Sequence, residues 1–223
     1  MLETLFPDEV VFCKAEGWMW ETPTLPEEEA FVEKAVSKRQ REFRAGRHSS
    51  HQALHELLDT PLHSNGPIIV GDSRQPCWPE GVVGSISHSG DHCSAVVAHS
   101  RDMLSIGHDV EKNKAIAQNT YSIICTRNEL NFININASAG IPLATIIFSA
   151  KESIHKTYSP INKHMLDFLD AEIELDITNK TFKAKILKPE PNPRYNIRVL
   201  NGKFAVDDGY IYTAICLRAS DVF

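Results

Sequence analysis

Alternating apolar and polar residues predict short antiparallel strands along the first half of the chain. The clearest pair surrounds a Ser-Gly-Asp turn at residues 89–91, a combination typical of a hairpin. Residues 61–81 are rich in Pro, Gly and Asn, and this stretch predicts an irregular binding loop. The strands expected in this half are residues 10–12, 18–20, 68–70, 84–88 and 94–98.

The second half repeats this pattern and adds a hairpin whose register can be predicted. With Asn179-Lys180 as a two-residue loop, Asp176 lies opposite Lys183 and Glu174 lies opposite Lys185. Further strands are expected at residues 106–111, 195–200 and 210–217, the last after an Asp-Asp-Gly turn.

Helical periodicity separates these strands in both halves. Thr24 followed by Pro26 and Glu27 predicts one helix that is acidic at its start and basic towards Arg47, as the helix dipole favours. A second helical pattern covers residues 53–58, and helical pieces are expected within 112–139. After the apolar run 141–147, Phe148 is expected to open another helix.

The fold class predicted from these elements is α+β with antiparallel sheets, and the chain divides at residues 100–102 into two halves, 1–101 and 102–223. The 223 residues carry a net charge of −6, which argues against a nucleic-acid-binding surface over the whole molecule. No apolar run reaches the length of a membrane span, and the start lacks a secretory pattern. Five scattered cysteines suit reduced thiols, so a cytoplasmic location is expected.

Two segments carry the chemistry of a divalent metal site. Asp109 and Glu111 are spaced i, i+2, which places both carboxylates on one face of a strand. Glu152 and Lys156 are i, i+4 neighbours on the later helix. Three carboxylates would suit Mg²⁺, and the lysine would suit a phosphate. Taken singly, each pair also fits a solvated strand face or a surface ion pair.

Six segments in order resemble the phosphopantetheinyl transferases of the surfactin-synthetase type, and most closely their enterobactin-synthetase branch. The last two are the defining pair of that family, and their order and separation fit. One departure is His108, where family members usually carry an apolar residue; strand alternation turns it away from Asp109, so it should affect packing. The segments are residues 5–9, 38–47, 76–81, 84–89, 106–111 and 148–156.

The resemblance implies two similar α/β halves related by a pseudo-twofold axis, with mostly antiparallel sheets, one long helix each, and coenzyme A in a cleft between them. It implies that Asp109, Glu111 and Glu152 bind Mg²⁺ together with the pyrophosphate of coenzyme A, and that Lys156 contacts this pyrophosphate. The residues expected at the 3′-phosphate and adenosine end are Arg39, Arg47, Arg74, Ser87 and His88.

The implied reaction moves 4′-phosphopantetheine from coenzyme A to a serine of an apo carrier protein and releases adenosine 3′,5′-bisphosphate. Glu152, directly or through a metal-bound water, is the candidate base, and Lys156 supports the leaving phosphate. Residues 112–141, from Lys112 to Ile141, are expected to meet the carrier. Carriers of siderophore or other nonribosomal peptide synthesis are favoured over those of polyketide and fatty-acid systems, and the family habit predicts a monomer.

Two other readings of these residues are open. A different Mg²⁺-dependent phosphoryl transferase would use the same carboxylates, although the chain has no Gly-x-x-x-x-Gly-Lys-Ser/Thr loop. A non-catalytic module that binds coenzyme A or a carrier is the second, and retention of all four metal-site and phosphate-site residues speaks against it.

Overall fold

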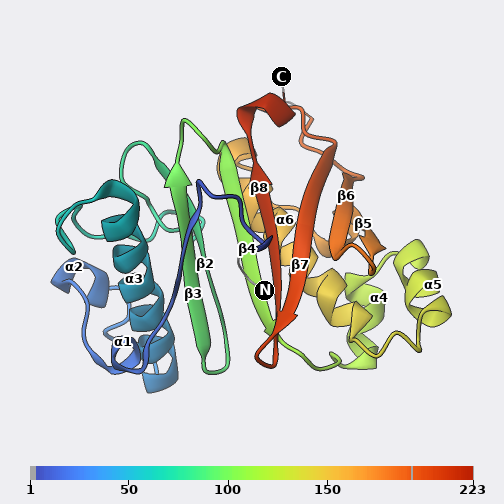
Figure 1. Cartoon of the computed structure of the whole chain (residues 1–223), viewed down its shortest axis with the longest axis horizontal. Helices are drawn as coiled ribbons and strands as arrows, with labels where there is room; N and C mark the ends of the chain where they lie inside the picture. Colours follow the sequence, from blue (N-terminus) through green and yellow to red (C-terminus); the bar gives the residue numbers. More distant parts are fainter. Residues whose placement is uncertain (1–3, 192, 223) are drawn as a thin grey trace. The chain divides into compact units, whose positions relative to one another are not determined.

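Two antiparallel sheets, each with one long helix packed on it, organise the chain (Figure 1). The structure is a computed structural model that describes residues 4–191 and 193–222. Its contacts separate Asp8–Leu104 from a second unit formed by residues 105–222 together with residues 4–7. The expected division fell three residues earlier, after residue 101, and placed the first residues with the first half.

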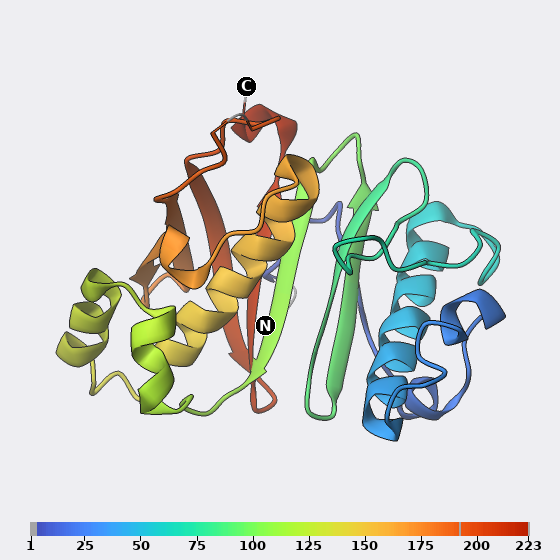
Figure 2. The ribbon, with the colours of Figure 1, turned by 180° about the vertical axis from the view of Figure 1, so that it is seen from behind.

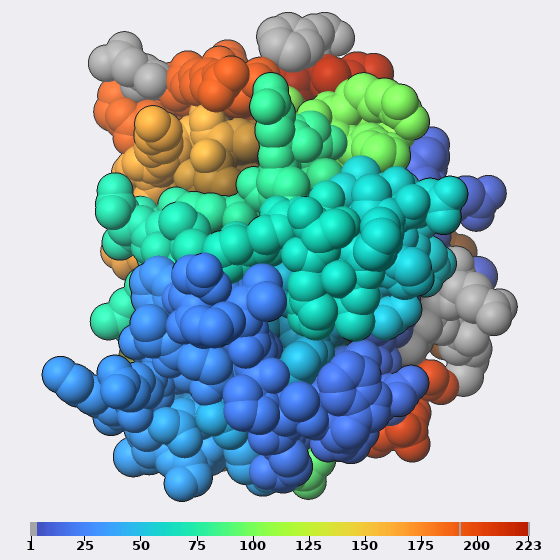
Figure 3. Space-filling model, turned by 90° about the vertical axis from the view of Figure 1, so that its left-hand side faces the viewer, coloured from blue at the N-terminus to red at the C-terminus, as the bar shows by residue number. Residues whose placement is uncertain are grey.

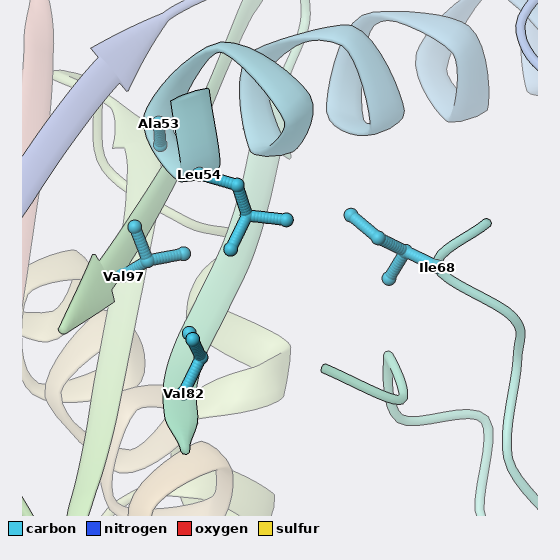
Figure 4. Close-up of a cluster of buried hydrophobic side chains, with 5 residues drawn as sticks. All are labelled: Ala53, Leu54, Ile68, Val82 and Val97. Carbon is cyan, nitrogen blue, oxygen red and sulfur yellow. The ribbon is translucent and has the colours of Figure 1, made fainter. Parts of the chain in front are cut away.

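In the unit Asp8–Leu104, three strands form a sheet of order β1-β3-β2. They are β1 (Val11–Lys14), β2 (Val82–Ser89) and β3 (His92–His99), and the β2–β3 hairpin turns at residues 90–91 as predicted. Helix α3 (Ser37–Leu58) packs against this sheet. Figure 4 shows the core that results, where five side chains meet from the helix, the sheet and the loop after α3: Ala53, Leu54, Ile68, Val82 and Val97.

Residues 18–20 are helical and not a strand, because they belong to α1 (Gly17–Glu21). Met19 and Trp20 are both buried whereas Trp18 is exposed, so two adjacent side chains share the inward face. Adjacent burial fits the 100° step of a helix and not the alternation of a strand. Trp20 packs with Ala45 of α3 and with Cys93 of β3, and this contact decides the local structure.

The single helix predicted from Thr24 onward is two helices, α2 (Pro26–Glu29) and α3. The acidic start and basic end of the pattern pair with one another across these helices, since Glu29 accepts hydrogen bonds from Arg44 at 2.8–3.2 Å. The predicted second pattern at 53–58 is the end of α3, which runs past Gly46 without a break. A Cβ on Gly46 would lie 3.0 Å from Ile86, so the glycine allows α3 to approach β2.

The predicted strand at 68–70 is also wrong, because within these residues only Val70 forms a bridge, with Pro76. In Figure 3, the face of this unit turned to the viewer is formed by the segment that leads into α3 (blue) and by the loop that follows it (teal).

The second unit has a five-stranded antiparallel sheet of order β4-β8-β7-β6-β5. Helix α6 (Leu143–Asn162) lies along one face of this sheet, as Figure 2 shows from behind. The predicted helical pieces are the short 3-10 helix η2 (Gln118–Thr120), α4 (Tyr121–Ile124) and α5 (Arg127–Ile135). The strands are β4 (Ser105–Lys112), β5 (Ala171–Asp176), β6 (Thr181–Ile186), β7 (Val199–Asp207) and β8 (Tyr210–Leu217), with the 3-10 helices η3 (Phe168–Asp170) and η4 (Ala219–Asp221).

The β5–β6 register differs by two residues from the prediction: Glu174 lies opposite Lys183, and Glu172 lies opposite Lys185. The loop contains residues 177–180 instead of two residues. Asp176 explains the longer loop, because its carboxylate accepts hydrogen bonds from the backbone N–H and the side-chain amide of Asn179. A shift of two keeps each residue on its predicted face.

Two boundaries also moved. The strand predicted at 195–200 begins only at Val199 and continues to Asp207. Helix α6 begins at Leu143 instead of Phe148, because the apolar run 141–147 supplies its first buried turns. Glu152 and Lys156 therefore lie in the middle of a long helix. Among the described residues, no helix is long and apolar enough to cross a membrane.

Candidate functional site

Gly107 sets the distance between strand β4 and helix α6, which together carry the predicted metal site. A Cβ atom at this position would overlap the carbonyl oxygen of Ser153 and the hydroxyl of Thr157. Only glycine allows the helix backbone to approach the strand this closely. Two residues later in β4, Asp109 lies opposite Thr213 of β8, on the face that α6 covers.

Asp109 is buried, and both of its carboxylate oxygens accept hydrogen bonds from α6. Oδ2 accepts from the Ser149 hydroxyl at 2.8 Å, and Oδ1 accepts from Lys156 Nζ at 2.8 Å. Lys156 Nζ also donates to the carbonyl oxygen of His108 at 3.0 Å. The structure therefore brings together Asp109 and Lys156, which are 47 residues apart in the sequence.

Glu152 lies one helical turn before Lys156, and Glu111 lies two residues beyond Asp109 on the same face of β4. Burial raises the pKa of the Glu152 carboxyl above its usual value, and the nearby Asp109 carboxylate raises this pKa further, while Lys156 opposes the shift. Two crowded carboxylates in a partly desolvated place favour a bound cation. The carboxylate oxygens fit the ligand preference of Mg²⁺.

As placed, the described residues contain no group of three or more His, Cys, Asp or Glu side chains arranged to hold a metal ion. The structure thus joins Asp109 with Glu152 through their charges and with Lys156 through a hydrogen bond, but it does not close a three-carboxylate ligand set. A cavity of about 240 Å³ lies beside Glu152. Its walls come from α6 and from the segment that follows it: Lys151, Glu152, Ile154, His155, Met165, Leu166, Asp167, Phe168 and Ala171.

Replacing Glu152 with glutamine should stabilise the protein at neutral pH. Because the pKa of Glu152 is raised in the folded state, its ionised form costs stability above that pKa, and the cost disappears below the usual carboxyl pKa. The melting temperature of Glu152→Gln should exceed that of the wild type at pH 7, at about 2–4 °C per kcal/mol, and match it near pH 4. The exposed Glu80→Gln variant is the control; a wild-type melting temperature at pH 7 would contradict the expectation.

A second group of predicted residues gathers in the other unit. Arg39 Nη1 contacts His88 Nε2 at 3.3 Å, and Ser87 is buried next to His88 on β2. Arg47 is buried, with its guanidinium 4.4 Å from the Phe43 ring centre. Burial lowers the pKa of Arg47 to about 10, Glu28 opposes the shift, and the charge of Arg39 adds to it. Two guanidinium groups whose positive charges repel each other suit the binding of a multiply charged anion.

Arg74 lies on the loop between α3 and β2, where it is exposed and has a φ of 63°. Its backbone N–H donates to the carbonyl oxygen of Gly71.

His108 is fully buried and packs away from the carboxylates, as strand alternation predicts. Its ring contacts Phe6 edge-on at 5.5 Å and stacks on Tyr212 at 6.4 Å.

Sequence reasoning did not single out three residues that support this site. Ser149 lies three residues before Glu152 and so on an adjacent helix face, a signal that helical periodicity could have given. Lys151 is buried, and its Nζ donates to Ile124 O, Glu129 Oε2 and Phe168 O, each at 2.8 Å. Thr213 comes from β8, and no local pattern connects it with the helix.

Comparison with known proteins finds family matches in both units. Residues 27–98 match the 4′-phosphopantetheinyl transferase N-terminal domain, and residues 105–215 match the 4′-phosphopantetheinyl transferase superfamily. The chain is 31% identical to the 4′-phosphopantetheinyl transferase Npt of Nocardia iowensis, over 96% of this chain and 99% of the relative. This chain belongs to the 4′-phosphopantetheinyl transferase superfamily.

Two further relatives show how much of this transferase is similar to other members of the family. The 4′-phosphopantetheinyl transferase PptT of Mycobacterium tuberculosis is 34% identical over 86% of both chains. Enterobactin synthase component D of Salmonella typhi is 36% identical, but over 56% of this chain and 50% of the relative. The similarity to the enterobactin branch thus covers about half of this transferase, whereas Npt and PptT match most of it.

Family membership confirms the predicted enzyme class and the predicted α+β fold class. The transferase moves 4′-phosphopantetheine from coenzyme A to carrier proteins, and enzymes of this family typically use Mg²⁺.

Proposed function

We propose that this transferase loads apo carrier domains of nonribosomal peptide or siderophore synthesis, with Asp109, Glu111 and Glu152 as the ligands of Mg²⁺. The observation that carries this proposal is the convergence of Asp109 of β4 with Glu152 and Lys156 of α6. The similarity to Enterobactin synthase component D supports the carrier class. The metal ion would neutralise the charge that develops on the pyrophosphate of coenzyme A.

The residues of the chain have separate roles in this scheme. The carrier serine hydroxyl attacks the phosphorus next to the pantetheine arm, and the bond from this phosphorus to the adenosine 3′,5′-bisphosphate oxygen breaks. Glu152 is the proposed base that receives the serine proton, directly or through water. Lys156 stabilises the negative charge on the departing phosphate, so its ammonium group would leave Asp109 Oδ1 for that oxygen.

In the other unit, Arg39, Arg47 and His88 form the proposed binding site for the 3′-phosphate of coenzyme A. Arg39 and His88 offer exposed and half-buried donors, and Arg47 adds a buried positive charge beside them. Ser87 and Arg74 complete the proposed set.

Removing the Arg39 side chain should weaken the selection of coenzyme A over its 3′-dephospho form. Arg39 is exposed, so Arg39→Ala leaves the core unchanged. A lost charge-assisted hydrogen bond of about 1.5–3 kcal/mol predicts a rise of about ten-fold or more in the KM for coenzyme A. The KM for 3′-dephospho-coenzyme A should stay unchanged. Lys38→Ala, one residue earlier and also exposed, is the control; equal effects of both variants would contradict the assignment.

Residues 112–141 are the proposed contact for the carrier. This segment follows the metal-site strand, contains η2, α4 and α5, and exposes Ile123 and Ile135 to 64% and 82%. Ile123→Asp should raise the KM for the carrier by about ten-fold, the effect of losing roughly 1.4 kcal/mol, and leave the KM for coenzyme A unchanged. Val36→Asp, an exposed apolar position in the other unit, is the control. Unchanged carrier preference after exchange of the whole segment would rule out this contact.

One assay tests the proposal as a whole. The protein is incubated with coenzyme A, Mg²⁺ and apo carrier domains from peptide, siderophore, polyketide and fatty-acid systems, and each carrier is weighed. A gain of one phosphopantetheine group, fastest on a peptide or siderophore carrier, is the expected result. A preference for fatty-acid carriers would overturn the carrier class, and no gain on any carrier would favour a non-catalytic relative. We further propose that the transferase is a cytoplasmic monomer.

A further inference from the structure

A chain of buried hydroxyl groups lies directly behind Asp109. Ser149 and Ser153 of α6 and Thr213 of β8 are all fully buried. The Ser149 hydroxyl is 2.8 Å from Asp109 Oδ2 and 3.0 Å from Thr213 Oγ1, and Ser153 Oγ is 2.7 Å from Thr213 Oγ1. Thr213 Oγ1 is also 2.9 Å from the carbonyl oxygen of Ser149. The helix and the sheet are therefore connected by hydroxyl groups at the position where the carboxylate lies.

The direction of the first hydrogen bond in this chain is fixed. An ionised carboxylate only accepts, so Ser149 donates its single hydroxyl hydrogen to Asp109. Thr213 then directs its hydrogen towards Ser149, to the hydroxyl or to the carbonyl oxygen. Ser153 directs its own towards the hydroxyl or the carbonyl oxygen of Thr213. When each hydroxyl donates to the next one, the order leads to the carboxylate, and neighbouring hydrogen bonds strengthen one another.

Close packing alone does not explain these hydroxyl groups. The approach of α6 to β4 is already allowed by Gly107, and Ala150 is buried on the same helix without any polar atom. Burying a hydroxyl group costs free energy unless the group is hydrogen-bonded. If only close packing were needed, alanine would therefore be the more favourable residue. What the hydroxyl adds is direction, because Ser149 holds Oδ2 of the Asp109 carboxylate in place.

We infer that Ser149, supported by Thr213, is a positioning residue that orients the Asp109 carboxylate for binding of the divalent cation. The inference rests on the proposed function, since it takes Asp109 as a metal ligand. Groups that hydrogen-bond to a metal ligand typically change metal affinity by about 10–100-fold when removed. Ser149 should therefore act on the metal affinity, and not on the carrier or on coenzyme A directly.

The test measures binding of Mn²⁺ as a probe for the Mg²⁺ site. Mn²⁺ is titrated into the full chain at a fixed, saturating concentration of coenzyme A, and free Mn²⁺ is followed by electron paramagnetic resonance. Ser149→Ala and Thr213→Val should raise the Kd for Mn²⁺, Ser149→Ala by about ten-fold or more. Thr213→Ser keeps the hydroxyl and should bind as the wild type does. The Mg²⁺ concentration for half-maximal transfer should rise by the same factor, with an unchanged KM for the carrier.

Ser105→Ala is the matched control. Its hydroxyl is also buried between β4 and α6 and donates to Thr157 O at 2.8 Å, but it does not touch Asp109. Thermal melting of both variants should show similar losses of stability, while only Ser149→Ala weakens Mn²⁺ binding.

Three results would overturn the inference. If Ser149→Ala binds Mn²⁺ as tightly as the wild type while Asp109→Ala does not, the inference fails and the proposed metal site stands. If Ser105→Ala weakens Mn²⁺ binding equally, the effect belongs to general packing, and the positioning role fails. If Asp109→Ala itself binds Mn²⁺ normally, the proposed metal site fails together with the inference.

Discussion

Asp109→Ala should abolish phosphopantetheine transfer and leave both units folded. Asp109 accepts hydrogen bonds from Ser149 and Lys156, and it contributes to the raised pKa of Glu152. Without this carboxylate, the proposed Mg²⁺ site loses a ligand, and Ser149 and Lys156 lose their common partner. A fall of about three orders of magnitude in kcat/KM, or roughly 4 kcal/mol, is expected. The rate of carrier mass gain measures it.

Asp109→Asn separates charge from shape. The amide has the same size and can still accept from Ser149, so the fold should persist while transfer fails. Asp176→Asn, an exposed aspartate of the β5–β6 turn, should transfer at the wild-type rate. Circular dichroism checks the fold of each variant. Wild-type turnover by Asp109→Asn would remove the case for a metal ion at this carboxylate.

Lys151→Met should destabilise the second unit by about 3–5 kcal/mol, the usual cost of leaving one partner of a buried ion pair alone. The Lys151 and Glu129 side chains are 2% and 0% exposed, and their charged atoms are 2.8 Å apart. The same ammonium donates to carbonyl oxygens of Ile124 and Phe168, so the substitution also removes these two hydrogen bonds. Glu129 would remain buried without its cationic partner and, among the described residues, would keep the hydrogen bonds from the backbone N–H groups of Thr126 and Ile173.

Denaturant unfolding measures this loss of stability. Two further variants serve as comparisons. Adding Glu129→Gln to Lys151→Met removes the carboxylate that has lost its partner, and should recover part of the stability. Lys188→Met breaks a pair with Asp170 at 2.7 Å, but Lys188 is 75% exposed, so a loss below about 1 kcal/mol is expected. Equal losses for Lys151→Met and Lys188→Met would show that burial of the pair contributes nothing.

The sequence predicted those parts of the fold that depend on local pattern. The β2–β3 hairpin, strand β4 and strand β8 lie where alternation placed them. The predictions failed where distant contacts decide: burial of Trp20 against α3 made a helix of residues 18–20, and the Asp176 turn shifted the β5–β6 register. Propensity is a weak guide once tertiary packing opposes it.

The candidate site shows the same division. Motif spacing identified Asp109, Glu152 and Lys156, and the structure brings these together. Motif spacing could not identify Thr213, because only the pairing of β4 with β8 places this residue beside Asp109. Nor could spacing reveal that Lys151, next to Glu152, is a buried anchor and not a solvent-exposed charge.

The contacts of residues 4–7 have a consequence for how the second unit can be dissected. Lys203 Nζ donates to the carbonyl oxygen of Thr4, and Phe6 packs on His108, so this unit is built from two segments that the first unit separates in the sequence. A fragment that starts at residue 105 would lack residues 4–7 and these contacts, whereas the same fragment joined to residues 4–7 by a linker could restore them.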